Sequence, residues 1–485
     1  MSDTLDPDDW DAFRTLAHRA VDDMVDYMST ARERPVWRPV PDEVRDSLSG
    51  PAPRRGKGEE AAYADFRDLV LPYPMGNTHP RFWSWYMGNG TPFGALADFL
   101  AATINPNLGG GSHAANLVEA QVIDWCKEIV GWPADASGLL VSGGSMANLI
   151  GLTVARNHMA PVDVREHGLQ SLDRPMLIYA SDEVHSCVHK TVEVLGLGTR
   201  SLREVPVDDA YRMDIERLRQ TVASDRELGA MPVCVIGNAG TINTGSVDDL
   251  NALADFCAQE GLWFHVDGAI GAVLRLAPQH RHLVDGIERA DSVTIDFHKW
   301  MHVPFEAACA LVKDRQAHWN TFALTHEYLE KADRGLASGP HWFSEYGLQL
   351  SRGFRALKIW LSIKEHGLDK YGRLIDRNIA LTKRLTKLIA DTKELELMAP
   401  TVINIACFRY NPGNTSEERL DRINRELLIR LQESGIAAPS YTTLGGRYCL
   451  RVAIVNYRSE EDDLDVFLDA TLRIGRELLN DSMAS

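Results

Sequence analysis

Lys299 is the residue in this chain whose setting most strongly suggests chemistry. It lies in the stretch 290–300, where Val293, Thr294 and Ile295 predict a buried strand. A lysine is rarely buried without a function, and an amine that has lost its water shell can form a Schiff base with a carbonyl group. An isolated lysine at a strand end more often simply reaches solvent, so the prediction depends on its neighbours.

A glycine-rich turn at 142–148 lies between an apolar strand pattern and a helical pattern. The start of a helix presents free backbone N–H groups and the positive end of its dipole, which suits an anion such as phosphate. Gly143, Gly144 and Ser145 are the candidate residues. The turn is not a Walker P-loop, because no Gly-Lys-Ser/Thr follows. By itself the pattern more often marks a plain tight turn.

Two further polar residues follow predicted strands. His185 comes just after the strand pattern at 176–179, where a lone histidine is usually only hydrogen-bonded or exposed. Asp267 closes the apolar strand pattern at 262–266, and a carboxylate in that position is costly unless it is paired. The small residues that follow it, among them Ala269, leave room for a flat ligand.

One ligand would use all four features, namely a flat phosphorylated aldehyde with a ring nitrogen. Pyridoxal phosphate is that ligand. Lys299 would form the Schiff base, Asp267 would pair with the ring nitrogen, His185 would stack on the ring, and the turn at 143–145 would bind the phosphate. Each signal is weak alone, but their occurrence together and in this order favours an enzyme over a binding or scaffold protein.

The elements that must position these residues alternate between strands and helices from about 138 to 311. This alternation predicts an α/β fold with a mostly parallel central sheet and helices on both of its faces. Ligands bind to such sheets at the carboxyl ends of the strands, which is where the four features fall.

The two ends of the chain predict separate units. Helical patterns at 10–30 and about 60–71, joined by proline-rich chain, predict an N-terminal helical arm over 1–76. We expect this arm to pack on another subunit, the alternative being its own chain. A large ligand-binding domain is predicted over 77–359 and a smaller α+β domain over 360–485.

Composition narrows the class of protein. The chain has 485 residues, a formal net charge of -17 and no basic run, so nucleic acid and anionic membranes are improbable partners. Its seven cysteines form no C-x-x-C pair, which argues against a metal site or a disulfide framework and fits a reducing compartment. No signal peptide or membrane span is evident, so we expect a cytoplasmic protein.

The chain resembles the group II pyridoxal-phosphate decarboxylases, the family of aromatic L-amino acid, histidine and glutamate decarboxylases. The blocks that carry the resemblance are His-Val-Asp-Gly-Ala at 265–269, Asp-Phe-His-Lys-Trp at 296–300, Ala-Gly-Thr at 239–241, Val-His-Ser at 184–186 and Phe-Arg-Ala-Leu-Lys at 354–358. The resemblance implies a type I, aspartate-aminotransferase-like fold and a homodimer with active sites at the interface. It also implies a mobile catalytic loop before Phe354, and it adds Thr241, Ala269, Asp296 and His298 to the expected cofactor-binding residues.

The product depends on a departure from the family pattern in that loop. Aromatic amino acid decarboxylases carry a tyrosine there that protonates the carbon of the quinonoid intermediate. An ungapped count places Phe343 in this position, and phenylalanine cannot donate a proton. Family members with this exchange resemble aldehyde synthases, which release aldehyde, ammonia and peroxide. A one-gap shift would instead bring Tyr346 into place, so amine and aldehyde both stay open, with the amine favoured.

The substrate depends on the wall of the pocket. Where aromatic decarboxylases carry a bulky apolar segment, this chain has the polar residues Asn105 and Asn107. The aromatic-rich stretch with His79, Trp83 and Trp85 favours an aromatic L-amino acid. An acidic or other polar amino acid is the alternative substrate, and transamination is an alternative reaction.

Overall fold

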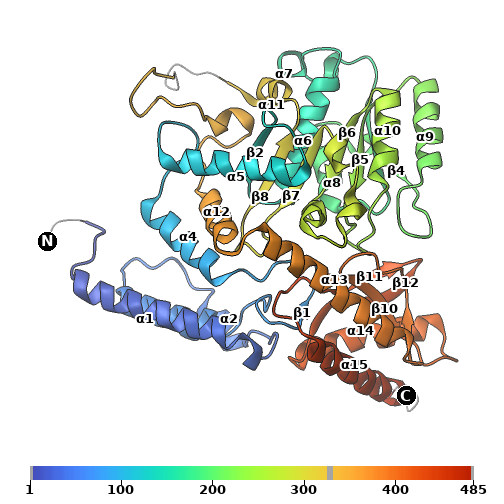
Figure 1. Cartoon of the computed structure of the whole chain (residues 1–485). Helices are drawn as coiled ribbons and strands as arrows, with labels where there is room; N and C mark the ends of the chain where they lie inside the picture. The colour runs from blue at the N-terminus through green and yellow to red at the C-terminus, as the bar shows by residue number, and fades with distance from the viewer. Residues whose placement is uncertain (1–3, 325–330, 482–485) are drawn as a thin grey trace.

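The computed structural model describes residues 4–324 and 331–481, and two β-sheets organise it (Figure 1). The larger sheet has the strand order β2-β8-β7-β6-β5-β3-β4. Its strands, in that order, are Ser137–Val141, Ala308–Val312, Ser292–Asp296, Trp263–Asp267, Met231–Asn238, Met176–Ser181 and Leu202–Val205. The pairs from β7 to β4 are parallel, and β8 runs antiparallel to both of its neighbours. The expected mostly parallel sheet is confirmed.

Helices cover both faces of this sheet because its strands are apolar on both sides. In β3 the side chains of Met176, Ile178 and Ala180 pack with α6 and α8, whereas Leu177 and Tyr179 face the opposite core with α9 and α10. The helices of this region are α4 Pro92–Ile104, α5 Ala114–Val130, α6 Gly144–Met159, α7 Val164–His167, α8 Ser186–Val194, α9 Ile215–Glu227, α10 Leu250–Glu260, α11 Arg315–Phe322 and α12 Arg355–His366.

The register of the strands aligns the polar residues at one edge of the sheet. Asn238 at the end of β5 pairs with Asp267 at the end of β6. Ala308 pairs with Asp296 on one side and with Val141 on the other. The chain that leaves β2 therefore emerges beside the end of β7, although β8 separates the two strands.

The smaller sheet has the order β1-β11-β12-β10-β9 and a separate apolar core. Its strands are Phe82–Trp83, Ala438–Leu444, Arg447–Ala453, Ile405–Tyr410 and Leu395–Leu397, and its helices are α13 Leu368–Ala390, α14 Glu417–Glu433 and α15 Glu461–Asp481. Helix α13 contacts both this sheet and the large domain, as Figure 1 shows. Residues 82–83 join the small sheet, although the predicted division placed them in the large domain.

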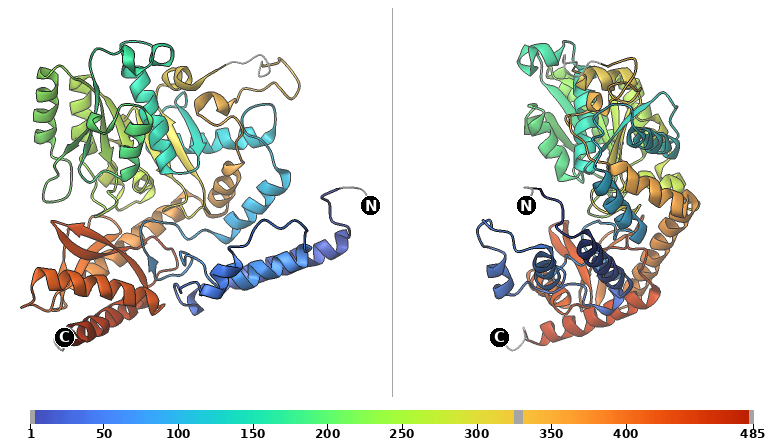
Figure 2. Two further views of the ribbon diagram at one scale, coloured as in Figure 1. Left: turned by 180° about the vertical axis from the view of Figure 1, so that it is seen from behind. Right: turned by 90° about the vertical axis from the view of Figure 1, so that its left-hand side faces the viewer.

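The N-terminal region carries α1 Trp10–Ser29, α2 Asp42–Ser47 and α3 Glu59–Asp65, followed by a π-helical turn at Phe66–Val70. Helix α1 lies to one side of both sheets in Figure 1 and in the view from behind (Figure 2, left). It buries Leu16 alone, while the Trp10 side chain is 59% exposed. The extended chain after it packs on its own small domain, where Val36 N donates to Gly435 O. Within the described residues, no helix is long and apolar enough to cross a membrane.

Candidate active site

A cavity of about 270 Å³ lies at the carboxyl edge of the large sheet and brings the four predicted features together. The turn at 143–145, His185, Asp267 and Lys299 all line it. The other lining residues are Asn148, Cys187, Asn238, Gly240, Ile242, Ala269, Ile270, Asp296 and His298. The structure therefore places these side chains as the pattern of strand ends predicts, while their individual roles stay predictions.

Asp267 is held in place by a buried hydrogen-bond network. Asn148 Nδ2 donates to its Oδ2 at 2.8 Å, and the Ala269 N–H donates to its Oδ1 at 3.1 Å. The Asn148 amide is itself fixed, because its Oδ1 accepts from Thr294 Oγ1 at 2.6 Å and contacts His265 Nε2 at 2.9 Å. Burial lowers the pKa of His265 to about 4, so this ring is neutral. The network sets the direction of a buried carboxylate before any ligand binds.

His185 begins helix α8 as its N-cap residue. Its Nδ1 accepts a hydrogen bond from the Cys187 N–H at 3.1 Å. Burial lowers the pKa of His185, although the charge of Asp267 opposes this effect. The ring is therefore neutral near pH 7, with its proton on Nε2, and it lines the cavity as a flat surface.

The glycines of the turn allow its backbone to approach the cavity closely. Helix α6 begins at Gly144 without a side-chain cap from its own N-cap residue, Gly143. A Cβ atom added at Gly144 would lie 3.0 Å from the Ala269 Cβ, and one at Gly143 would lie 3.3 Å from His298 Cε1. Larger residues would fill the space above the helix start, where the N–H groups can bind an anion.

Lys299 lies in the tight turn after β7 and is half-buried. The turn is held from outside the sheet by Gly88, whose N–H donates to His298 O at 2.9 Å. A Cβ atom at Gly88 would lie only 2.3 Å from Lys299 O, so no larger residue fits there without movement. The backbone of Lys299 is thus held in place, and the residue lines the cavity.

One predicted site residue requires correction. Trp83 is fully buried in the core of the small domain, where its ring packs edge-on against Phe467 and its Nε1 donates to Ser459 Oγ. It does not line the cavity, because β1 pairs with β11 and turns this side chain into the small core. Thr241 lies next to two residues of the cavity wall, Gly240 and Ile242, and its contact with a cofactor stays a prediction. Its hydroxyl group bonds with Thr244 Oγ1 at 3.0 Å and stabilises the turn beside the cavity.

Four other predicted substrate residues lie outside this cavity in the single chain. His79 is buried, and its Nδ1 accepts from the Arg81 N–H. Trp85 is 57% exposed. Asn105 ends α4 in a left-handed conformation, and Asn107 Oδ1 accepts from the Gly109 and Arg352 N–H groups. Their contact with a substrate stays a prediction.

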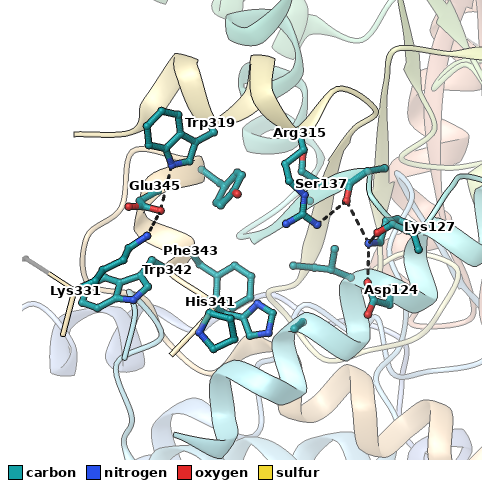
Figure 3. Close-up of a pocket in the computed structure, with 17 residues that line it drawn as sticks. Asp124, Lys127, Ser137, Arg315, Trp319, Lys331, His341, Trp342, Phe343 and Glu345 are labelled. Carbon is teal, nitrogen blue, oxygen red and sulfur yellow. Dashed lines mark hydrogen bonds and ion pairs between the residues drawn. The ribbon is translucent and has the colours of Figure 1, made fainter. Parts of the chain in front are cut away.

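Phe343 lies in a second cavity, of about 380 Å³ (Figure 3). Its ring stacks on His341 with centroids 5.8 Å apart, and the Arg352 guanidinium lies 5.3 Å from the ring centroid. Tyr346 lines the same cavity and packs edge-on against His318. Neither residue lines the Lys299 cavity of its own chain. The structure of the single chain therefore does not choose between them, and both stay candidates for the protonation site. Residues 325–330 of the predicted loop lie outside the described residues.

The sequence pattern missed several residues that the structure brings to the site. Asn148 has the clearest signal, because it follows Gly144 by four residues and so lies on the same face of a helix. Asn238 ends a strand, as Asp267 does, and its Nδ2 donates to Ser181 Oγ. Cys187, in the first turn of α8, and Ile270, in the turn after β6, reach the cavity through the way these segments pack, for which the sequence has no periodic signal.

Comparisons with known proteins agree with this geometry. The family described as "Pyridoxal-dependent decarboxylase conserved domain" matches residues 41–411. The aromatic-L-amino-acid decarboxylase of Bacillus atrophaeus is 33% identical over 93% of both chains. The phenylacetaldehyde synthase of Arabidopsis thaliana is 29% identical over 94% of both chains. The crystal structure of Oryza sativa TDC with PLP and tryptamine matches with a TM-score of 0.89 at 26% identity, covering 98% of this chain and 100% of that chain.

Proposed function

The chain belongs to the pyridoxal-dependent decarboxylases, and on that premise we propose that it converts an aromatic L-amino acid to the corresponding amine. It is a carboxy-lyase with the type I fold, and its cofactor is pyridoxal phosphate. The observation that carries the proposed chemistry is the meeting of Lys299 with a fixed Asp267 carboxylate in one cavity. The aromatic substrate is supported by the relatives named above.

The residues of the cavity fit the cofactor. Asp267 offers a carboxylate for a protonated ring nitrogen, and the Gly144 and Ser145 N–H groups lie at a helix start that suits a phosphate. A side chain at Gly144 would run into the Ala269 Cβ, so the small residues at these two positions keep this part of the cavity open. When bound, pyridoxal phosphate supplies an electron-poor ring that accepts the electron pair released as carbon dioxide leaves.

The residues of this chain would then divide the work. Lys299 supplies the amine that bonds to the aldehyde group, and a free lysine amine can carry a proton. Asp267 would keep the ring nitrogen protonated by pairing its carboxylate with it. Asn148 holds that carboxylate in place. Neutral His185 offers a flat face to the ring and adds no positive charge that would compete with the ring for Asp267.

An aldehyde product is the second candidate. It is favoured by Phe343, which has no proton to donate, and by the similarity to the phenylacetaldehyde synthase. A polar substrate is the third candidate, favoured by Asn105 and Asn107 if these residues reach an active site. In the single chain both lie outside the Lys299 cavity.

We also propose that the active protein is a homodimer. Apolar side chains are exposed along the N-terminal helices and α4, which a partner copy would cover. They include Trp10, Phe13, Val21, Val25, Phe99 and Ile104. We place the protein in the cytoplasm, since its seven cysteines are all buried and unbonded.

The substrate assignment can be tested with a panel of tyrosine, dopa, tryptophan, phenylalanine, histidine, glutamate, aspartate and lysine. We expect an amine from at least one aromatic substrate, identified by product mass. Aldehyde with peroxide would favour the oxidative alternative, and a keto acid would indicate transamination. Amine formed from glutamate or aspartate alone would refute the aromatic assignment.

A further inference from the structure

Asp296 occupies the hydrogen-bond donors that a phosphate would use. It is the last residue of β7 and is 2% exposed. The Gly144 N–H, at the start of α6, donates to its Oδ2 at 3.0 Å, and the His298 N–H donates to its Oδ1 at 3.0 Å. The helix start assigned to the phosphate is therefore already bound to a carboxylate of the same chain.

The His298 side chain also lies beside Asp296. Its Nδ1 lies 3.3 Å from the Ala307 nitrogen and accepts that N–H, so the proton of a neutral ring is on Nε2. Nε2 lies 3.1 Å from Asp296 Oδ2. Burial lowers the pKa of His298 to about 3, and the charges of Lys299 and Lys358 act in the same direction. The ring is thus neutral and lies against Asp296 without a compensating positive charge.

Charges of both signs surround Asp296. Lys299 in the following turn favours the ionised carboxylate, whereas Asp267 at the end of β6 disfavours it. Helix α6 contributes only the Gly144 N–H and its dipole. Burial raises the pKa of Asp296 to about 6. An ionised Asp296 and a phosphate dianion on the same donors would repel each other strongly.

We propose that Asp296 takes the place of the cofactor phosphate in the cofactor-free protein and becomes protonated when the phosphate binds. The proton comes from solvent and remains covalently bound to an Asp296 oxygen, whose O–H then donates to a phosphate oxygen. The phosphate in turn accepts the Gly144 N–H. This proposal rests on the pyridoxal phosphate cofactor and not on the choice of substrate.

The proposal predicts how cofactor affinity changes with pH. Because the bound state requires a protonated Asp296, cofactor affinity falls as the pH rises above the pKa of this residue in the free protein. Each pH unit above that point costs up to about tenfold in affinity. An asparagine at this position carries no charge, so the Asp296→Asn variant should bind the cofactor more tightly at alkaline pH and lack this dependence.

The experiment compares cofactor-free wild-type protein with Asp296→Asn. The dissociation constant of pyridoxal phosphate is measured from tryptophan fluorescence between about pH 6 and about pH 8.5. Titration of the phosphate in free solution is common to both measurements and cancels in the ratio of their constants. We expect the wild-type constant divided by the variant constant to rise about tenfold per pH unit. With pyridoxal, which lacks the phosphate, the ratio should stay constant.

A second measurement uses the wild-type protein alone. Calorimetric titrations in two buffers of different ionisation enthalpy report the protons taken up on binding. We expect pyridoxal phosphate to take up about one proton more than pyridoxal at pH values above the pKa of Asp296. An equal proton count for the two ligands would overturn the proposal. So would parallel pH profiles for wild type and Asp296→Asn, or weaker binding by the variant at every pH.

Discussion

The Lys299 cavity and the Phe343 cavity lie in the same domain but are built in different ways. Lys299, Asp267 and their neighbours come from the ends of adjacent strands, and buried hydrogen bonds hold them. The wall around Phe343 combines side chains of α5, α11 and the start of β2 with the irregular segment that precedes α12, where Lys331 and Glu345 form an ion pair. The pairing of strands sets the positions of the residues at a sheet edge, whereas the residues of a loop can change without loss of the fold. We infer that the residues at the sheet edge carry out the chemistry common to the family, whereas the residues around Phe343 select the product.

The largest effect should come from Lys299→Ala. Without the amine the protein cannot bond the aldehyde, so the visible absorbance band of lysine-bound cofactor should disappear and turnover should fall at least about a thousandfold. Lys331→Ala, in the Phe343 cavity, is the matched control and should retain the band. A band that persists in Lys299→Ala would show that another amine holds the cofactor.

Asp267→Asn should cost about a hundredfold in kcat while cofactor remains bound. The amide cannot stabilise a proton on the ring nitrogen as a carboxylate does. Steady-state kinetics with the best substrate of the panel measure the effect, and Asp124→Asn in the Phe343 cavity is the control. If both variants lose activity equally, the distinction between the two cavities is wrong.

Glu119→Gln tests how much a buried ion pair next to Phe343 contributes to the stability of the protein. Glu119 and Arg352 form an ion pair that is fully buried, and Arg352 also donates to Leu140 O in β2. Removing one charge leaves the other buried and uncompensated, so we expect the free energy of unfolding to fall by about 3 kcal/mol. Denaturant unfolding measures this loss. Glu345→Gln, in a partly exposed pair, should change it by less than about 1 kcal/mol.

Phe343→Tyr should have the smallest effect on turnover but should change the product. A hydroxyl group at the protonation site would raise the ratio of amine to aldehyde at least about tenfold. Product masses and peroxide release report the ratio. Tyr346→Phe is the companion variant, and a shift towards aldehyde in that protein would identify Tyr346 as the donor. No change in either product with Phe343→Tyr would remove Phe343 from the site.

The predictable part of the site follows from strand periodicity. Asp267 and the turn at 143–145 were predicted because ligands gather where parallel strands end, and strand ends are visible in the sequence. The alternating pattern likewise predicted the layers of the large domain. Asn148 was not predicted as a site residue, because its contact with Asp267 depends on how α6 crosses the sheet.

Contacts between distant segments account for the errors. The density of aromatic residues around Trp83 suggested a pocket wall, but β1 pairs with β11, far along the chain, and this pairing turns Trp83 into a core. No local pattern reports such a pairing. Asn105, Asn107 and Phe343 could not be placed in a site for a related reason, since their surroundings depend on loops and on any partner copy.

The position of β8 between β2 and β7 has a consequence for biosynthesis. Gly144 and Asp296 become neighbours only when Ala308 has paired with both Val141 and Asp296. A nascent chain therefore cannot form the anion site until the ribosome has released residues well beyond 300, and such long-range pairings form slowly. Cofactor capture must then follow assembly of the large sheet, so the cofactor cannot serve as a template for the early steps of folding.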